Sequence, residues 1–106
     1  MRFWWLCLLA AGCTISREDY PAKYTRAWCN AYEECFQADF DSMYEGQKEC
    51  REEVLPSIED AADALDVFGD YDEEHAVECI HRMRTASCEE YREDVSFSEC
   101  EGVWHD

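Results

Sequence analysis

Aromatic residues recur at every fourth position through the early part of the chain. They are Tyr20, Tyr24, Trp28, Tyr32, Phe36, Phe40 and Tyr44. At about 100° per residue, the apolar positions of 21–36 span an arc of about 200°, and the polar residues gather on the remaining face. So wide an arc predicts a central helix packed against two neighbours, because an exposed aromatic array of this size would favour aggregation. Phe40 and Tyr44 follow two aspartates and are predicted to lie in the next loop.

A second apolar repeat, with spacings of three or four residues, runs from about 46 to 66. Its members are Cys50, Val54, Ile58, Ala61 and Leu65. This spacing predicts a helix whose inner face includes Cys50. Pro56 interrupts the repeat. Because proline lacks an N–H and its ring clashes with the preceding turn, we expect a kink there, or two short helices in sequence.

A third helix is predicted from Asp72 to about Ser87. Asp72 is a favoured N-cap residue, and the two glutamates after it suit the positive end of the helix dipole. The inner face is predicted to consist of Ala76, Cys79, Ile80 and Met83. A short fourth helical turn is predicted within 89–95.

The tail 97–106, FSECEGVWHD, is interpreted as a loop that Cys100 ties down, with Val103 and Trp104 available to pack on the bundle. Alternating strand patterns and Asn-Gly or Asp-Gly hairpin turns are missing from the sequence. The sequence therefore predicts an all-α fold. It is a small disulfide-stapled bundle of three to four helices, forming one domain over 21–106.

The charge of the chain restricts its partners. The 106 residues include 26 Asp and Glu but only nine Lys and Arg, which gives a formal net charge of −17. This balance argues against binding nucleic acid, whose phosphates require clustered basic residues. It also argues against an electrostatic grip on anionic lipid. A basic protein partner remains compatible with it.

The first residues, MRFWWLCLLAAGC, have the layout of an export signal. One arginine precedes an apolar run over 3–11, and small residues follow. The run is too short for a membrane span, which needs about 20 residues. We therefore expect 1–12 to be an export signal that is cleaved before Cys13.

Leu9-Ala10-Ala11-Gly12-Cys13 resembles the lipobox of bacterial lipoproteins, which implies that Cys13 becomes the acylated first residue. Residues 13–20 would then be a tether from the lipid to the domain. The wider layout is similar to that of small cysteine-rich bacterial lipoproteins of unknown function. The segments AWCNAYEEC, GQKECREEV and YDEEHAVECIHRMRTASC carry this likeness. The resemblance implies an anchored envelope protein but no chemistry. Ordinary secretion, with a general signal peptidase cutting at the same bond, is the alternative.

The number of cysteines agrees with a lipidated Cys13. The chain has eight, and Cys7 would leave with the signal. Lipidation of Cys13 leaves six that can pair completely in an exported protein. These are Cys29, Cys35, Cys50, Cys79, Cys88 and Cys100.

The pairing of these six cysteines is open among 15 arrangements. Cys29 and Cys35 lie about 120° apart on one helix, so each is expected to reach a different neighbouring helix. Helix order favours Cys35–Cys50, Cys88–Cys100 and Cys29–Cys79.

Metal-binding patterns are weak in the sequence. Cys-x-x-Cys pairs are missing, which argues against zinc. Asp72-x-x-His75 and Glu78-x-x-His81 each resemble the carboxylate-x-x-His unit of di-iron bundles. However, His75 and His81 point about 120° apart on one helix and are not expected to share an ion. The remaining histidine, His105, lies in the tail. We expect no metal site and no cofactor.

Catalytic patterns are missing as well. The serines occupy no nucleophile elbow, and the four single glycines form no phosphate-binding loop. We expect no enzymatic activity. The predicted function is that of a lipid-anchored cell-envelope protein, a non-catalytic binding or structural module with an acidic surface. It would face the periplasm or lie at the outer membrane. The alternatives are a freely secreted helical protein, such as an inhibitor or toxin-like effector, and a small metal-binding protein.

Overall fold

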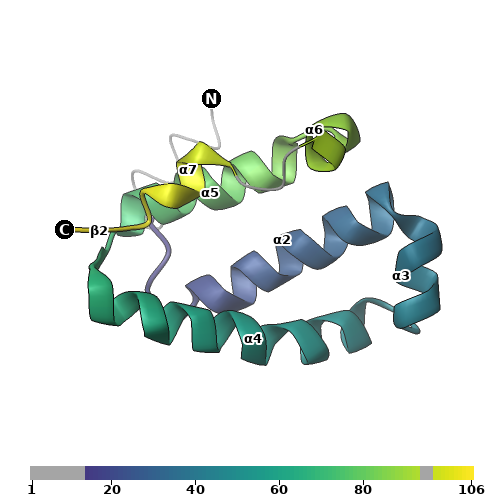
Figure 1. Ribbon diagram of the computed structural model, residues 1–106, viewed down its shortest axis with the longest axis horizontal. Helices are drawn as coiled ribbons and strands as arrows, with labels where there is room; N and C mark the ends of the chain where they lie inside the picture. The colour runs from purple at the N-terminus through teal and green to yellow at the C-terminus, as the bar shows by residue number, and fades with distance from the viewer. Residues whose placement is uncertain (1–13, 94–96) are drawn as a thin grey trace.

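The fold is a set of helices around one central helix (Figure 1). The structure is a computed structural model, and it describes residues 14–93 and 97–106. The helices are α2 (Tyr20–Cys35), α3 (Gln37–Met43), α4 (Gln47–Phe68), α5 (Glu73–Thr85), α6 (Cys88–Glu93) and α7 (Ser98–Glu101). Two short strands, β1 (Asp70–Tyr71) and β2 (Trp104–His105), form an antiparallel pair. The predicted all-α, disulfide-stapled class is confirmed, and the strand pair is a small addition to it.

Helix α2 is the predicted central helix. It runs between α4 on one side and α5 on the other, and it packs against both (Figure 1). Pro21 lies in its first turn, where the missing N–H costs no helical hydrogen bond. Tyr20, Ala27 and Cys29 are buried. The wide apolar arc is therefore used on two sides, as the aromatic spacing indicated.

Helix α3 corrects the prediction of a loop after α2. Phe36 leaves the helical conformation, and a new helix then begins at once at Gln37. Phe40 is 1% exposed and packs with Tyr44 against the buried Cys29 and Cys50 in a second, smaller core. The four-residue aromatic spacing continued across the break, and burial of these rings outweighs the local preference of the aspartates for a turn.

Helix α4 is continuous, so the prediction of two short helices was wrong. Pro56 lies inside it. Both halves are held independently, since Cys50 is cross-linked and Ala62 is buried. Pro56 itself is exposed, so water is available to the carbonyl oxygen that loses its helical partner. The predicted end of the helix, at Val67 to Gly69, agrees with the observed end at Phe68.

Helix α5 begins as predicted. One carboxylate oxygen of Asp72, Oδ1, accepts hydrogen bonds from the backbone N–H groups of Glu74 and His75, each at 2.9 Å. The predicted inner face is buried; it consists of Ala76, Cys79, Ile80 and Met83. Helix α6 confirms the predicted fourth helical turn, although it begins one residue earlier, at Cys88, and Val95 lies outside the described residues.

The tail is not the predicted loop. It contains α7 and then β2, which pairs with β1 in the register Asp70 to His105 and Tyr71 to Trp104. Val103 is buried, which confirms that it packs on the bundle, and its carbonyl oxygen accepts a 2.7 Å hydrogen bond from the Asp72 N–H. A two-residue strand leaves no alternating pattern in the sequence, so only the tertiary structure reveals it.

The segment predicted as a tether packs against the fold over its described residues, 14–20. Ile15 is 8% exposed, and its carbonyl oxygen accepts a 2.5 Å hydrogen bond from the Tyr71 hydroxyl. The Arg17 guanidinium bonds Asp66 and Asp63 of α4 at 2.9 and 2.8 Å. Any free tether must therefore end before residue 14. Cys13, the predicted lipidation site, lies outside the described residues.

All six predicted cysteines form disulfides, but all three guessed pairings were wrong. The pairs are Cys29–Cys50, Cys35–Cys88 and Cys79–Cys100. The guess assumed a simple loop between the first two helices. Because α3 intervenes, the start of α4 comes back alongside Cys29 rather than Cys35. Cys35, at the end of α2, meets the start of α6 instead.

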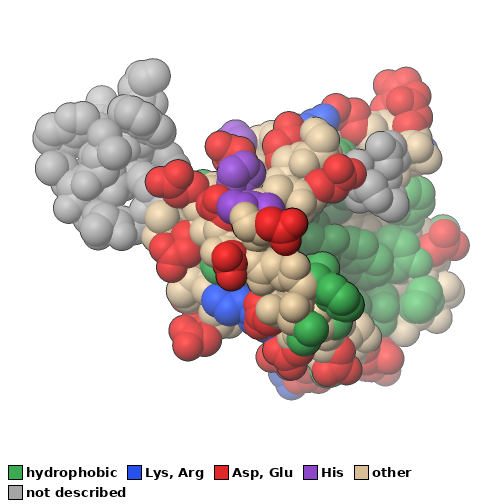
Figure 2. All heavy atoms as spheres, turned by 60° about the vertical axis from the view of Figure 1, so that its left-hand side comes forward, with side chains coloured by type: hydrophobic (Ala, Val, Ile, Leu, Met, Phe, Trp, Pro, Cys, Tyr) green, Lys and Arg blue, Asp and Glu red, His purple; other side chains and the backbone are tan. Residues whose placement is uncertain are grey.

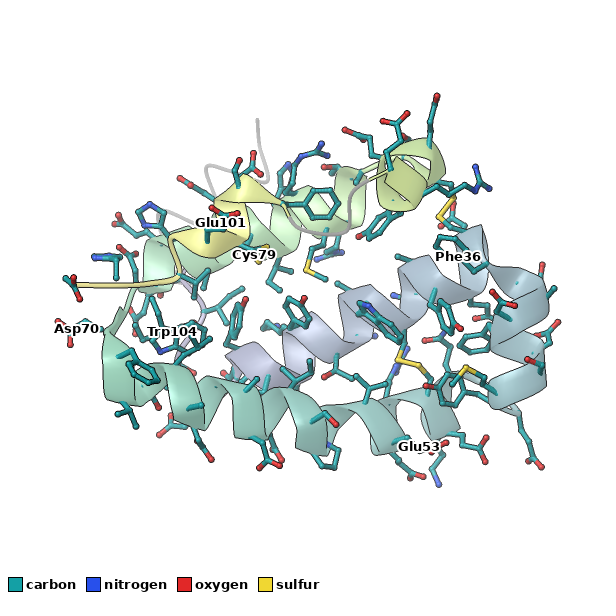
Figure 3. All side chains as sticks on the ribbon, viewed as in Figure 1. Phe36, Glu53, Asp70, Cys79, Glu101 and Trp104 are labelled. Carbon is teal, nitrogen blue, oxygen red and sulfur yellow. A yellow bond between two sulfur atoms is a disulfide. The ribbon has the colours of Figure 1, made fainter. Side chains whose placement is uncertain are left out.

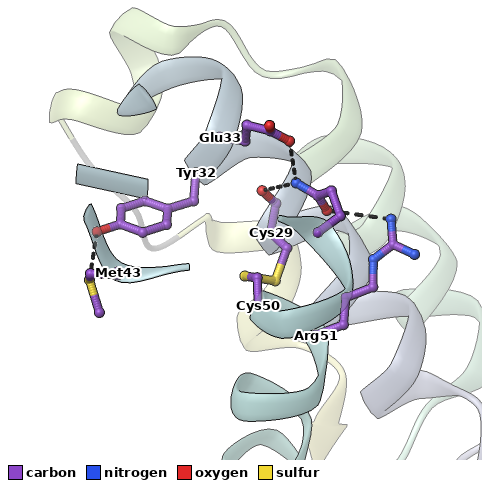
Figure 4. Close-up of a disulfide and its surroundings, with 7 residues drawn as sticks. Cys29, Tyr32, Glu33, Met43, Cys50 and Arg51 are labelled. Atoms are coloured by element: carbon purple, nitrogen blue, oxygen red, sulfur yellow. Dashed lines mark hydrogen bonds between the residues drawn. A yellow bond between two sulfur atoms is a disulfide. The ribbon is translucent and has the colours of Figure 1, made fainter. Parts of the chain in front are cut away.

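Helix α2 is thus cross-linked on two sides, as the 120° separation of its cysteines predicted. Around the first cross-link, the Gln47 side chain donates to the Cys29 carbonyl oxygen at 3.1 Å and to the Glu33 carboxylate at 2.6 Å (Figure 4). These bonds join the first turn of α4 to α2 beside the disulfide. Three disulfides in so short a chain indicate an oxidising, extracytoplasmic compartment.

Candidate functional site

An apolar groove runs along one side of α2. One part, of about 310 Å³, lies between α2 and the group formed by α5, α6 and α7. The other part, of about 220 Å³, lies between α2 and α4 and reaches β2. Both parts are lined by Tyr24 and Cys100, so they adjoin. Figure 2 shows hydrophobic side chains lining a recessed area on this face of the molecule.

The aromatic residues of α2 form the floor of the groove. Tyr24 and Trp28, four residues apart on one face of the helix, line the first part, and Tyr20 and Tyr24 line the second. Tyr20 is held from below by its hydroxyl, which lies 3.4 Å from Cys79 Sγ. Because Cys79 is in a disulfide and has no S–H, the Tyr20 hydroxyl is the donor. Tyrosine is uncharged at neutral pH, and burial raises the pKa of the Tyr24 phenol further.

One wall of the groove is held by contacts around Tyr91. Its hydroxyl donates a hydrogen bond to the Met83 carbonyl oxygen, and its ring meets Phe97 edge to face at 5.3 Å. The guanidinium of Arg82 lies 4.9 Å from the centre of the Phe97 ring. The Cys79–Cys100 disulfide joins α7 to α5. The wall is therefore a fixed structure built around a cross-link, although α7 has only four residues.

Trp104 closes the opposite end of the groove, between the C-terminal part of α4 and the start of α2 (Figure 3). Its indole N–H donates to Asp66 Oδ1 at 2.7 Å, and its ring meets Tyr20 at 5.4 Å. Arg17 bonds the same Asp66 carboxylate and lies 5.7 Å from the centre of the Trp104 ring. The hydrogen bonds from Arg17 and Trp104 lower the pKa of Asp66, so the carboxylate stays charged and keeps both partners.

Acidic side chains surround the apolar lining. Glu101 borders the first part of the groove, on α7 (Figure 3). Glu34 borders a neighbouring cleft of about 200 Å³, which shares Met83 and Tyr91 with the first part of the groove. With a net charge of −17, the surface favours a cationic ligand over an anionic one.

We expect the protein to lose stability at high pH, because the phenol groups of Tyr71 and Tyr91 are harder to ionise in the folded state. Burial raises the pKa of each phenol to about 12, compared with about 10 in an unfolded chain. The folded state therefore holds these protons more tightly. Their stabilising contribution is complete below about pH 10 and is lost as the pH rises toward 12.

Urea unfolding at several alkaline pH values, with tyrosinate absorbance followed in parallel, tests this prediction. The free energy of unfolding should fall over the interval in which the buried tyrosines ionise. Replacing Tyr91 by phenylalanine should flatten that fall. An unchanged slope in the Tyr91→Phe variant would contradict the assignment.

Of the metal-binding candidates that the sequence suggested, some come together in the structure and others do not. His75 and His81 do not converge, as their angular separation predicted, and His81 is exposed. Asp72 and His75 do come together, and His105 of the tail joins them. The sequence alone did not indicate that His105 would join Asp72 and His75, because this contact depends on the pairing of β1 with β2.

No protein-family model matches this chain, and no curated protein or solved structure is detectably similar to it. Within 14–93 and 97–106, no helix has both the length and the apolar character that crossing a bilayer requires.

Proposed function

We propose that this protein is an exported, lipid-anchored module of the cell envelope that binds a cationic, amphipathic segment of another protein. Apolar side chains of the partner would enter the groove along α2, and its basic residues would face the acidic rim. The observation that carries the proposal is an apolar groove held open by cross-linked walls on a strongly acidic molecule.

The size and chemistry of the groove suit side chains rather than a buried metabolite. Its two parts, of about 310 and 220 Å³, are lined mainly by aromatic and aliphatic groups. A peptide that lays an apolar stripe in such a groove gains affinity from burial, and opposite charges at the rim raise the association rate. Because disulfides fix the walls, little ordering would be needed on binding. We propose no catalytic step.

The lipid anchor is proposed from the Leu-Ala-Ala-Gly-Cys segment and from the count of cysteines. Six cysteines are consumed in three disulfides, which leaves Cys13 without a partner among them. An acylated Cys13 would hold the groove close to the membrane surface, where the packed residues 14–20 allow only a short reach. The lipid, rather than charge, would provide the membrane affinity.

The alternative is a freely secreted protein with the same groove, such as an inhibitor or toxin-like effector. The high density of disulfides favours this class equally, because small secreted domains use them to offset a limited core. The two forms differ at Cys13. Fractionation of the producing cells after Cys13→Ala replacement separates them: release of the variant from the membrane fraction supports the anchor. If the original protein, with Cys13 intact, is already free in the medium, that result would contradict the anchor and favour secretion.

The groove itself is tested with two substitutions on α4 that change charge equally. Leu65 lines the groove and is 43% exposed, whereas Val67 lies outside its lining and is 78% exposed. The probe is a helical peptide of leucine and lysine, with a leucine and glutamate peptide as its counterpart. We expect the lysine peptide to bind. Leu65→Lys should weaken the affinity for this peptide at least tenfold, and Val67→Lys should have a much smaller effect. Equal losses in the two variants, or equal binding of both peptides, would contradict a groove-centred site.

A further inference from the structure

Asp72, His75 and His105 bring three metal-binding groups together at the start of α5. The Oδ2 atom of Asp72 lies 2.8 Å from His75 Nδ1 and 2.9 Å from His105 Nε2. One nitrogen from each imidazole and one carboxylate oxygen all lie within 4.8 Å of one another. Figure 2 shows histidine side chains gathered side by side among acidic groups on this part of the surface.

From this geometry we propose that Asp72, His75 and His105 form a binding site for a divalent transition-metal ion of the zinc class. Two imidazole nitrogens and one carboxylate oxygen are the ligands that zinc takes in three-residue protein sites, with water in the remaining position. Zinc is borderline in softness and suits nitrogen donors, whereas calcium and magnesium require sets of oxygen ligands. The donor set therefore favours zinc over the cations that a merely acidic surface attracts.

The two distances from Asp72 Oδ2 to the imidazole nitrogens come close to those of a tetrahedral ion. With zinc–ligand bonds of about 2.1 Å, two ligand atoms in a tetrahedral site are about 3.4 Å apart. The nitrogens of His75 and His105 would thus move away from Asp72 Oδ2 by about 0.6 and about 0.5 Å. In the metal-free protein a proton occupies each of these two gaps. Metal binding moves that proton to the other nitrogen of a neutral imidazole, or releases it to water from a charged one.

The fold holds Asp72 in place independently of any metal. Its Oδ1 atom is used as the N-cap of α5, where it accepts two backbone hydrogen bonds, and this leaves Oδ2 directed at the histidines. His75, three residues later, lies one helical turn away on the same side as the cap. A ligand oriented by a second set of hydrogen bonds is typical of protein metal sites.

Three features bring His105 to the site from the far end of the chain. The strand pair sets His105 opposite Asp70, two residues before Asp72 (Figure 1). The Cys79–Cys100 disulfide holds the preceding helix against α5. Gly102 lets the chain pass close to the His75 ring, because a Cβ there would lie 2.7 Å from His75 Cδ2. The close approach is thus built into the backbone.

The site is accessible to an ion from solvent. The His75 and His105 side chains are 46% and 50% exposed, which leaves room for water in the open coordination position. A bound ion would join the start of α5 to the last strand. It would therefore stabilise the tail that forms one end of the groove, and that stabilisation grows with the free metal concentration.

The test is a titration of the oxidised protein with Zn²⁺, at physiological salt and with excess Ca²⁺ to occupy non-specific acidic groups. Calorimetry gives the stoichiometry, and Co²⁺ substitution reports coordination by visible absorption. We expect one ion per chain and a higher melting temperature in its presence. His75→Gln and His105→Gln should each weaken binding at least tenfold. Asp72→Asn should do the same while keeping α5, because asparagine is also a good N-cap.

His81→Gln is the matched control, since His81 lies on the same helix but outside the cluster. It should bind Zn²⁺ as the original protein does. The proposal is overturned if the original protein shows no saturable binding under these conditions. It is equally overturned if His81→Gln weakens binding as much as His105→Gln, because the ion would then be held by the general surface.

Discussion

Replacing Cys35 and Cys88 together by serine is expected to lower the free energy of unfolding by about 4 kcal/mol. These residues are 53 positions apart, the largest separation among the three pairs. In the chain-entropy account, a longer closed loop restricts the unfolded chain more, and a loop of this size contributes about 4 kcal/mol. Because small domains have a total stability of about 5–15 kcal/mol, the variant should remain folded only marginally. Urea unfolding of the two oxidised proteins measures the difference.

The matched comparison is the double serine variant at Cys79 and Cys100. Its loop spans 21 positions, so the loss of the cross-link contributes about 3 kcal/mol. This variant should also release α7 from α5 and weaken binding in the groove. The Cys35 and Cys88 variant should affect stability more than binding. Little destabilisation by either change would contradict the role of the cross-links in holding the fold.

Replacing Phe40 by alanine is expected to lower the free energy of unfolding by about 3–5 kcal/mol. The side chain is 1% exposed and packs between Tyr32 and Tyr44, with ring centres 6.0 and 5.4 Å away. Truncation removes buried surface and leaves a cavity beside the Cys29–Cys50 disulfide. Equilibrium unfolding with the disulfides intact gives the value.

Two controls separate this loss from a general effect of substitution. Phe40→Leu keeps most of the buried volume and should cost about 1 kcal/mol. Val67→Ala, at an exposed position of α4, should change stability by less than about 0.5 kcal/mol. If Phe40→Ala behaved like Val67→Ala, the Phe40 side chain would not be buried, and α3 would not be part of a core.

Local signals in the sequence predicted the elements that local physics determines. The wide apolar arc of 21–36 predicted α2 and its two packing partners. Asp72 and the glutamates after it predicted the start of α5, and both oxygens of Asp72 proved to be used. In these cases the cause of the structure lies within the helix itself, so the residues of that segment were sufficient to predict it.

The sequence did not predict the long-range pairings, which are those of the cysteines and of the two strands. The guessed disulfides failed because one unpredicted helix, α3, changed which residues of α2 and α4 face each other. The prediction of a loop for the tail was wrong for a similar reason, since β2 exists only through its pairing with β1. Short helices and two-residue strands have weak local signals, and their stability comes from burial and cross-linking.

The candidate sites combine both kinds of information. Tyr24 and Trp28 were assigned to a core, and they are half-buried because α4 and α5 leave the side of α2 between them uncovered. The Asp72-x-x-His75 unit was recognised in the sequence, but no metal site was expected there because His81, on the same helix, points away from His75. Only the strand pair and the close approach at Gly102 identify His105 as the partner.

The fold and the anchor are tested together by the mass of the protein isolated from its producing cell, with peptide mapping before and after reduction. We predict an acylated Cys13 and six cysteines that react with alkylating agents only after reduction. Peptides should be linked as Cys29–Cys50, Cys35–Cys88 and Cys79–Cys100. Thiols that react before reduction, or peptides linked in other pairs, would contradict the fold, and an unmodified Cys13 would contradict the anchor.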